Sequence, residues 1–217
     1  MRIHCKFLSV LWKIGLAGCA FMGIALQIGL FRGEFHASSF RYFTNLSNLF
    51  CLLYFLIDSI YLLARRKNDG SQSWLPALKG AAMMGVTITC LVANFLLGSF
   101  TMGATMRIAI RLVHLVVPVM TVLDWLLFDK KGSFTWLSPL GWFIFPRVYF
   151  GAILLLAAVL PGTPFYPYPF MDVSSRGLVS VLVTVAVLTA LFIALGYLFV
   201  LIDRLLAKAG KKASPAV

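Results

Sequence analysis

Charged residues are scarce in this chain. Only 12% of its 217 residues are Asp, Glu, Lys or Arg, whereas 61% are hydrophobic, and the mean hydropathy is +0.93. So little charge excludes an ordinary soluble domain and indicates an integral membrane protein. The apolar runs are also continuous. They lack the alternating pattern, in segments of about ten residues, that is typical of transmembrane β-barrels.

The continuous runs predict an all-α fold. Six of them reach the roughly 20 residues that a helix needs to cross a bilayer. They cover residues 9–31, 40–64, 75–99, 106–128, 139–160 and 174–203. We therefore expect one transmembrane domain of six helices over residues 1–207, followed by a basic tail over 208–217. No internal repeat is evident, which argues against transporters that are built from inverted repeats.

Acidic residues are the scarcer of the two charge classes. The chain has 19 Lys and Arg but 7 Asp and Glu, for a net charge of +12. Basic residues concentrate in the segments that would share one side if the helices alternate: Arg2, Lys6, Arg65, Arg66, Lys67, Lys130, Lys131, Arg204, Lys208, Lys211 and Lys212. The positive-inside rule then places both termini in the cytoplasm. The charge thus reflects membrane topology, and we expect membrane lipids as partners and no nucleic acid.

Recognised catalytic motifs are missing. The chain has no G-x-S-x-G, H-E-x-x-H, P-loop or Rossmann pattern. Its four cysteines, Cys5, Cys19, Cys51 and Cys90, have no zinc or redox spacing, and we expect no disulfide. With no visible ligand cluster, we expect neither a metal nor a cofactor.

Polar residues inside the apolar runs form stripes. Helical residues advance by about 100° each, which puts one set in the second run and one in the fourth run on a single face of each helix. The two sets are Arg41, Thr44, Asn48, Cys51, Phe55 and Asp58, and Arg107, Arg111, His114, Pro118, Thr121 and Trp125, with Asp124 at the flank. Hydrocarbon cannot satisfy such groups, so the stripes should face each other inside the bundle.

These polar residues fall into two layers. Asp58, Asp124 and Arg147 lie toward the cytoplasmic half. Two acids and one base predict an ion-pair cluster, which we interpret as a structural element that sets helix register.

The outer layer contains Arg41, Thr44, Asn48, Arg111 and His114. A threonine hydroxyl becomes a useful nucleophile when a base takes its proton, and a neutral histidine can be that base. Asparagine or arginine could stabilise the resulting oxyanion. The alternative is that these residues only join helices, since Thr, Asn and His commonly form hydrogen bonds in membrane bundles.

The segment over 161–170, PGTPFYPYPF, contains four prolines and four aromatic residues. Such a segment is stiff and amphipathic. It could anchor the chain at the membrane interface, or it could form a wall or lid over a cavity.

Three segments together resemble a known family: FRYFTNLSN at 40–48, LVHLVVPVMTVLDWLLF at 112–128 and YPYPFMDV at 166–173. They are similar to bacterial six-helix membrane proteins related to the eukaryotic androgen-induced and androgen-dependent TFPI-regulating proteins. The eukaryotic members are membrane threonine hydrolases of fatty acid esters of hydroxy fatty acids. The resemblance implies a bacterial cytoplasmic membrane protein with Thr44 as nucleophile and His114 as base.

The resulting hypothesis is a hydrolase of lipid esters. Asn48, with Arg41 or Arg111, would bind the oxyanion or a lipid carboxylate. One rival is a lipid or small-molecule transporter, whose polar stripes would line a path from Asn48 to Asp58 and Asp124. The other is a structural membrane protein in which the same residues only hold helices together.

Overall fold

The computed structural model describes residues 2–65, 67–95, 103–159 and 166–212. The described residues form six helices that are long and apolar enough to cross a membrane. These spans are Lys6–Gln27, Phe43–Ala64, Pro76–Phe95, Ala104–Phe128, Ser138–Val159 and Leu178–Gly210. The six-helix prediction is therefore confirmed, with each boundary within a few residues except at the end of the last span.

Three spans are single helices at the start of the chain: α1 (Lys6–Gln27), α2 (Phe43–Ala64) and α3 (Pro76–Phe95). The fourth is composite, with α4 (Ala104–Arg111), a π-helical segment η3 (Leu112–Val116) and α5 (Val117–Phe128). The fifth joins α6 (Ser138–Trp142) to α7 (Ile144–Val159). Short helices η1 (Leu30–Arg32), η2 (Ala37–Arg41), η4 (Pro169–Met171) and α8 (Val173–Arg176) lie in the connections.

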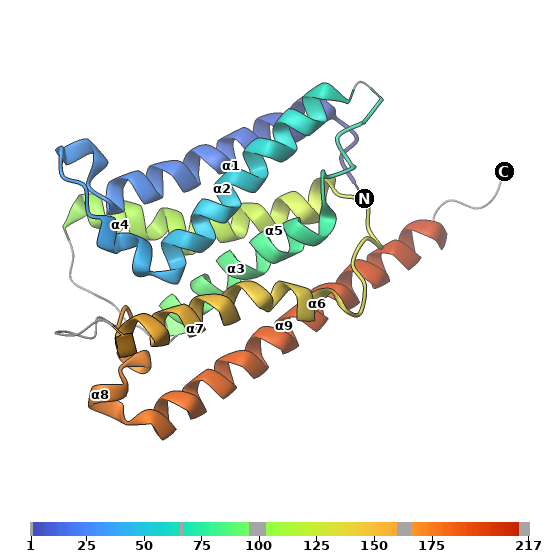
Figure 1. Cartoon of the computed structure of the whole chain (residues 1–217). Helices are drawn as coiled ribbons and strands as arrows, with labels where there is room; N and C mark the ends of the chain where they lie inside the picture. The colour runs from blue at the N-terminus through green and yellow to red at the C-terminus, as the bar shows by residue number, and fades with distance from the viewer. Residues whose placement is uncertain (1, 66, 96–102, 160–165, 213–217) are drawn as a thin grey trace.

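The last span, α9 (Leu178–Lys212), is the longest described helix. Its 35 residues extend about 52 Å at 1.5 Å per residue. It projects past the other helices toward the C-terminus (Figure 1). The helix includes Lys208 and runs to Lys212, so the first half of the predicted tail continues the helix. Residues 213–217 lie outside the described residues.

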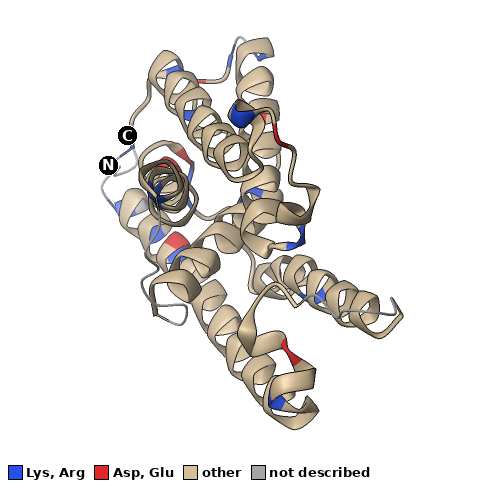
Figure 2. Ribbon diagram, turned by 90° about the vertical axis from the view of Figure 1, so that its left-hand side faces the viewer, with Lys and Arg blue, Asp and Glu red and all other residues tan. Residues whose placement is uncertain are grey.

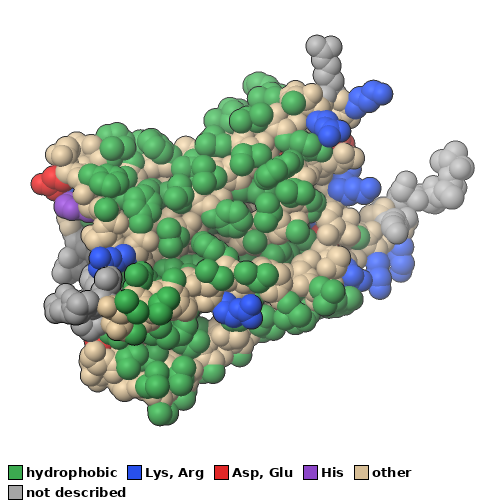
Figure 3. Space-filling view, viewed as in Figure 1, with side chains coloured by type: hydrophobic (Ala, Val, Ile, Leu, Met, Phe, Trp, Pro, Cys, Tyr) green, Lys and Arg blue, Asp and Glu red, His purple; other side chains and the backbone are tan. Residues whose placement is uncertain are grey.

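The start of α1 and the end of α9 lie at the same end of the bundle (Figure 1). Basic side chains gather at that end, and most of the remaining visible face is hydrophobic (Figure 3). This is the charge asymmetry that the sequence predicted. The loops 65–75 and 129–137 are at the basic end, and the connections 28–42 and 166–177 are at the opposite end.

Two cores hold the helices together. The first is built from small and aliphatic residues of α1, α2, α3 and α5, including Leu16, Ala17, Ala20, Val86 and Val117. Small residues allow helix backbones to approach closely in a membrane, where the hydrophobic effect does not drive helices together. Gly23 shows the limit: a β-carbon there would lie 2.6 Å from Cγ1 of Val113, so the contact between α1 and η3 requires glycine.

The second core is aromatic. It joins α3 and α5 to α6, α7 and α9 through rings such as Trp125 of α5, Phe134 of the loop that follows, Trp142 of α6 and Phe192 of α9. The last two spans are packed far less than the first three. Only 11% of their most apolar windows is buried inside the protein, against 44–50% for α1, α2 and α3. The fifth and sixth spans therefore pack loosely against a tighter core. This packing leaves room for a cavity between these two spans and the core.

Candidate functional site

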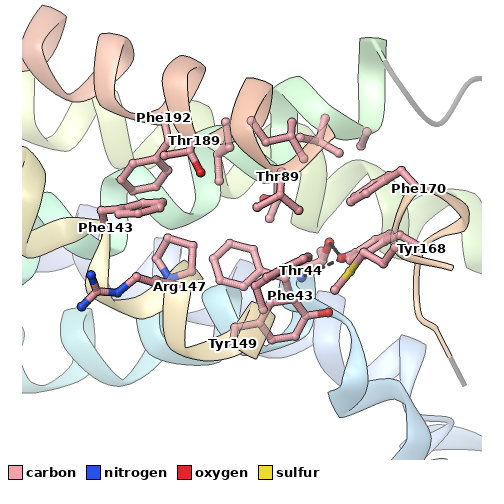
Figure 4. Close-up of a pocket in the computed structure, with 18 of the residues that line it drawn as sticks. Phe43, Thr44, Thr89, Phe143, Arg147, Tyr149, Tyr168, Phe170, Thr189 and Phe192 are labelled. Atoms are coloured by element: carbon pink, nitrogen blue, oxygen red, sulfur yellow. Dashed lines mark hydrogen bonds between the residues drawn. The ribbon is translucent and has the colours of Figure 1, made fainter. Parts of the chain in front are cut away.

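A cavity of about 150 Å³ lies where the loosely packed spans meet the tight core. Its wall comes from α2, α3, η3, α7, α9 and the segment that leads into η4 (Figure 4). Most of the lining is aromatic or aliphatic. Its polar side chains are Thr44, Thr89, His114, Arg147, Tyr149, Tyr168 and Thr189. Two of these, Thr44 and His114, are the nucleophile and base predicted from sequence, and the fold brings them to one cavity from different spans.

Thr44 is the second residue of α2, and its side chain is buried. The first N–H groups of a helix have no partner within the helix, and the helix dipole makes this end positive. Tyr42 precedes the helix with extended backbone, and its carbonyl accepts hydrogen bonds from the N–H groups of Asn45 and Leu46. A negative charge that develops on Thr44 Oγ1 would lie in this positive field.

Tyr168 is the direct partner of Thr44. Its hydroxyl lies 3.4 Å from Thr44 Oγ1 and accepts a hydrogen bond, also at 3.4 Å, from the Thr44 backbone N–H (Figure 4). Burial raises the pKa of the Tyr168 phenol above its ordinary value. The phenol therefore keeps its proton and can donate a hydrogen bond to an oxygen of a bound ligand. Sequence reasoning named the 161–170 segment but assigned no role to Tyr168.

The described part of that segment forms a wall of the cavity. Tyr168, Phe170 and Met171 all line it, and the rings of Tyr168 and Phe170 stack at 5.1 Å. Residues 161–165 lie outside the described residues. Of the two interpretations of the segment, the wall agrees with the position of Tyr168 to Met171.

His114 lies in the π-helical segment η3. The backbone N–H of Val117 bonds to the carbonyl of Leu112, five residues back. Pro118 follows and has no N–H to continue the regular pattern. Such π-helical turns are often found at functional sites, and the signal for this one in the sequence is the proline four residues after the histidine.

The π turn also fixes how His114 presents its ring. Its Nδ1 lies 3.3 Å from the carbonyl oxygen of Thr89, which can only accept a hydrogen bond. The bond therefore requires the proton on Nδ1, and a neutral ring then carries a lone pair on Nε2. That nitrogen is the one available to act as a base.

Asn48 connects the two halves of the site. Its Nδ2 donates to the carbonyl of Thr44 at 2.9 Å and to the carbonyl of Val113 at 3.3 Å. In a regular helix the Val113 carbonyl would accept from the N–H of Val117, but the π turn has redirected that group. Asn48 thus supplies the missing donor. Both N–H groups of the Asn48 amide thus donate to backbone carbonyls, and the residue is fully buried. Neither N–H is left for an oxyanion, which is the role that the sequence predicted for Asn48.

The other predicted binding residues lie elsewhere. Neither Arg41 nor Arg111 is among the residues that line the cavity. Arg41 ends η2, where its carbonyl accepts a hydrogen bond of 2.8 Å from the Tyr149 hydroxyl. Arg111 ends α4 and is exposed. The structure therefore places Thr44 and His114 at one cavity, where the Tyr168 hydroxyl, and neither Arg41 nor Arg111, lies beside Thr44 Oγ1.

The predicted ion cluster exists, but with different cations. Lys13 bonds both oxygens of Asp124, at 2.7 and 2.9 Å, and pairs with Asp58 at 3.3 Å. Lys79 pairs with Asp124 and, at 2.6 Å, with Asp129. Asp58 is also held by the N–H of Trp74, which donates to its Oδ1 at 2.6 Å. We call these five residues, Lys13, Asp58, Lys79, Asp124 and Asp129, the ion cluster.

The assignment of Arg147 to this cluster is wrong. Arg147 is an exposed residue of α7 that lines the cavity. The long side chains of Lys13 and Lys79 instead reach the acids from α1 and α3, which pack directly against α2 and α5. A charge near the middle of a span costs about 2.5–3.5 kcal/mol on insertion scales. Lys13 recovers that cost through its acids, whereas none of the described acids pairs with Arg147.

Close packing separates the ion cluster from the cavity. Cys51 and Thr121 lie between them, with Cys51 Sγ 3.5 Å from Thr121 Oγ1. Both are fully buried, as are Asn48 and Phe55. These four residues thus have no surface that water can reach.

Within the described ranges, no three His, Cys, Asp or Glu side chains come together in a way that could hold a metal ion. Comparison of the chain with protein families, with characterised proteins and with solved structures found no match to any of them.

Proposed function

We propose that this protein is an intramembrane hydrolase of lipid esters, with Thr44 as nucleophile and His114 as general base. The observation that carries the proposal is that these two residues, from α2 and η3, line the same apolar cavity. The resemblance described above implies the same pair and suggests fatty acid esters of hydroxy fatty acids as substrates.

The proposed reaction has two halves. His114 Nε2 takes the proton from Thr44 Oγ1 as that oxygen attacks the ester carbonyl carbon. Tyr168 donates a hydrogen bond to the resulting oxyanion. When the intermediate collapses, His114 returns the proton to the leaving alkoxide, and the alcohol departs from an acyl-Thr44. His114 then takes a proton from water as the water oxygen attacks the acyl carbon. When this second intermediate collapses, the bond to Thr44 Oγ1 breaks, His114 returns the proton to Thr44 Oγ1, and the fatty acid leaves.

No hydrogen bond joins Thr44 and His114 among the described residues. Catalytic hydrogen bonds are often long before substrate binds and tighten in the complex. The lining is largely apolar, which suits acyl chains. Two of its polar side chains, Thr89 and Thr189, carry no charge. A lipid ester bound there would bring its carbonyl group between nucleophile and base.

We further propose that the basic end of the bundle faces the cytoplasm of a bacterial cell. Lys and Arg gather at this end (Figure 3), as the positive-inside rule requires. The cavity would then lie in the outer half of the membrane. The buried layer of Cys51, Phe55 and Thr121 favours this hydrolase over a transporter, because a transporter needs a polar path between the two layers.

The test uses purified protein, a fluorophosphonate probe and a panel of lipid esters. We expect labelling and turnover that disappear in Thr44→Ala. The matched control is Ser47→Ala, because Ser47 has a hydroxyl on the same helix, is buried and does not line the cavity. Ser47→Ala should keep labelling and turnover. Absence of both from the wild-type protein across the whole panel would contradict the proposal.

A further inference from the structure

Arg147 has no counter-ion among the residues that the structure describes. It lies nine residues into the 22-residue span Ser138–Val159, about 13 Å from the start of a span roughly 33 Å long. Arg147 is the one basic residue of α7, whose other residues are almost all apolar. The described residues give its guanidinium no ion pair and no hydrogen bond.

The acidic residues account for this. The chain has only seven, and all of them lie in the described ranges (Figure 2). Each of them already has another partner. Glu34 pairs with His36 and Asp69 with His4, and Asp58, Asp124 and Asp129 pair with the lysines of the ion cluster. Asp172 accepts from N–H groups at the start of α8, and Asp203 accepts from those of Gly132 and Phe134. Neither α3 nor the span that contains Arg147 has an acid. None of the seven acidic side chains is thus available to Arg147, and a bound ligand is a source of the missing anion.

The position of Arg147 in the cavity indicates what kind of anion. Its side chain lies at the end of the cavity away from Thr44 and Tyr168, and its guanidinium points outward from the other lining residues (Figure 4). The wall between these polar ends is apolar, with Phe43, Phe143 and Phe192. Across the cavity, α9 contributes Val185, Leu188, Thr189 and Phe192. A ligand that satisfies both features has an apolar chain and an anionic head.

The access route follows from the packing. The fifth and sixth spans are the least buried in the bundle, and both contribute to the cavity wall. The cavity is thus bounded toward the lipid by α7 and α9 rather than by the tight core. A single-chain amphiphile could enter sideways from the membrane between them, passing Arg147 on the way.

We propose that Arg147 binds the carboxylate or phosphate head of an anionic amphiphile whose chain occupies this cavity. Guanidinium groups bind both of these anions through paired hydrogen bonds. The binding site goes beyond the proposed function and does not depend on ester hydrolysis. If hydrolysis also holds, Arg147 selects anionic substrates and sets how far the scissile ester lies from the head.

The experiment measures binding in nanodiscs of zwitterionic lipid. The probe is the fluorescent methyl ester of parinaric acid, which is uncharged, and the competitors are oleate, 1-oleoyl lysophosphatidate and methyl oleate. All measurements use Thr44→Ala protein, so that no ester is hydrolysed by Thr44 and a failure of the proposed function leaves the result readable.

We expect oleate or the lysophosphatidate to bind roughly 10- to 100-fold more tightly than methyl oleate, as a charge-assisted hydrogen bond provides. Arg147→Gln should remove this advantage and leave methyl oleate binding unchanged, and Arg147→Lys should keep part of it. Arg176→Gln, an exposed arginine of α8, is the matched control and should keep all of it. The preferred competitor identifies the head group as carboxylate or phosphate.

A second variant tests the chain. Thr189→Trp fills the cavity from α9 and should weaken all three competitors and the probe alike. If neither oleate nor the lysophosphatidate binds the Thr44→Ala protein more tightly than methyl oleate, the proposal is overturned. It is also overturned by an advantage of the preferred anion that survives Arg147→Gln, or by binding that Thr189→Trp leaves unchanged.

Discussion

The ion cluster and the cavity are both polar intrusions into an apolar bundle, yet they are built in opposite ways. In the ion cluster, Lys13 and Lys79 are fully buried and each pairs with two acids. In the cavity, Thr44 has one long contact to Tyr168, and Arg147 has no partner among the described residues. Polar groups that satisfy one another hold a structure together, whereas polar groups left open toward a cavity are available to a ligand.

This contrast predicts that substitutions in the two regions have separable effects. Those in the ion cluster should change stability, and those at the cavity should change activity while the fold is preserved. The predictions below test that separation, beginning with the largest expected effect.

Asp124→Asn should be the most damaging change to stability. Asp124 bonds both lysines, so its loss leaves two buried ammonium groups short of negative charge. Removing one partner of a buried ion pair costs about 3–5 kcal/mol. SDS titration of the protein in mixed micelles, followed by tryptophan fluorescence, measures the change in the free energy of unfolding.

The matched control for Asp124 is Glu34→Gln, which removes an exposed acid beside His36. It should change stability by less than about 0.5 kcal/mol. If Asp124→Asn unfolds at the same SDS fraction as the wild type, the ion cluster does not stabilise the bundle and the contrast fails on that side.

Tyr168→Phe should have the opposite profile. Removing an oxyanion donor lowers kcat about 10²–10³-fold in enzymes that form such intermediates. The ring and its packing on Phe170 and Tyr42 remain, and only the long hydrogen bond from the Thr44 N–H is lost, so stability should fall by about 1 kcal/mol, well below the loss in Asp124→Asn. Because burial raises the pKa of the phenol, wild-type kcat should also show no loss from its ionisation as the pH approaches 10.

Tyr166→Phe is the control, since Tyr166 lies in the same segment but does not line the cavity. Its kcat should stay at the wild-type value. A Tyr168→Phe protein with full kcat on an active ester would show that another donor holds the oxyanion.

The two regions also differ in how far the sequence could predict them. The spans and the burial of Asp58 and Asp124 followed from apolar runs and from the cost of charge in hydrocarbon. The cations of the ion cluster do not follow from these patterns. Depth in the span alone pairs Arg147 with the two acids. The rotation of α1 and α3 against their neighbours decides that Lys13 and Lys79 reach them instead, and helix rotation in a packed bundle is a tertiary property.

At the cavity, helical spacing placed Thr44 and His114 in one layer. It could not show Tyr168, because the 166–171 segment is largely irregular and folds back through tertiary contacts that no periodicity encodes. Nor could it show that the Asn48 amide donates a hydrogen bond to the Val113 carbonyl, because this bond depends on the π turn. The sequence thus predicted which residues are polar and buried but not which of them remain available.

Asn48→Leu tests the boundary between the two regions. The substitution leaves the Val113 carbonyl without its donor, and an unsatisfied buried group costs about 1–3 kcal/mol. The π turn that orients His114 should loosen as well, so kcat should fall along with stability. Asn94→Leu is the control, because Asn94 is exposed and bonds only within its own helix. Loss of stability with unchanged kcat would show that the turn holds His114 without Asn48.

The smallest effect is expected outside both regions. Asp69, in the connection between α2 and α3, accepts a hydrogen bond from the side chain of Ser71 and lies 2.6 Å from Nδ1 of His4, and these contacts lower its pKa from 3.8 to about 2. A carboxylate whose pKa is lower in the folded state stabilises the fold above its unfolded pKa and loses that contribution as the pH falls toward its folded pKa. Asp69→Asn should therefore destabilise the protein at pH 7.

Solvent screening limits this contribution, because both side chains are about half exposed. We expect less than about 1 kcal/mol, as for other surface pairs. SDS titrations at pH 7, 5, 3 and about 1 should show the gap between wild type and variant narrow below about pH 4 and close by about pH 1. A gap that stays open at about pH 1 would mean that the ionised Asp69 carboxylate is not its source. A gap several times larger would mean that this surface pair is coupled to the ion cluster, and the division between saturated interior and exposed periphery would have to be redrawn.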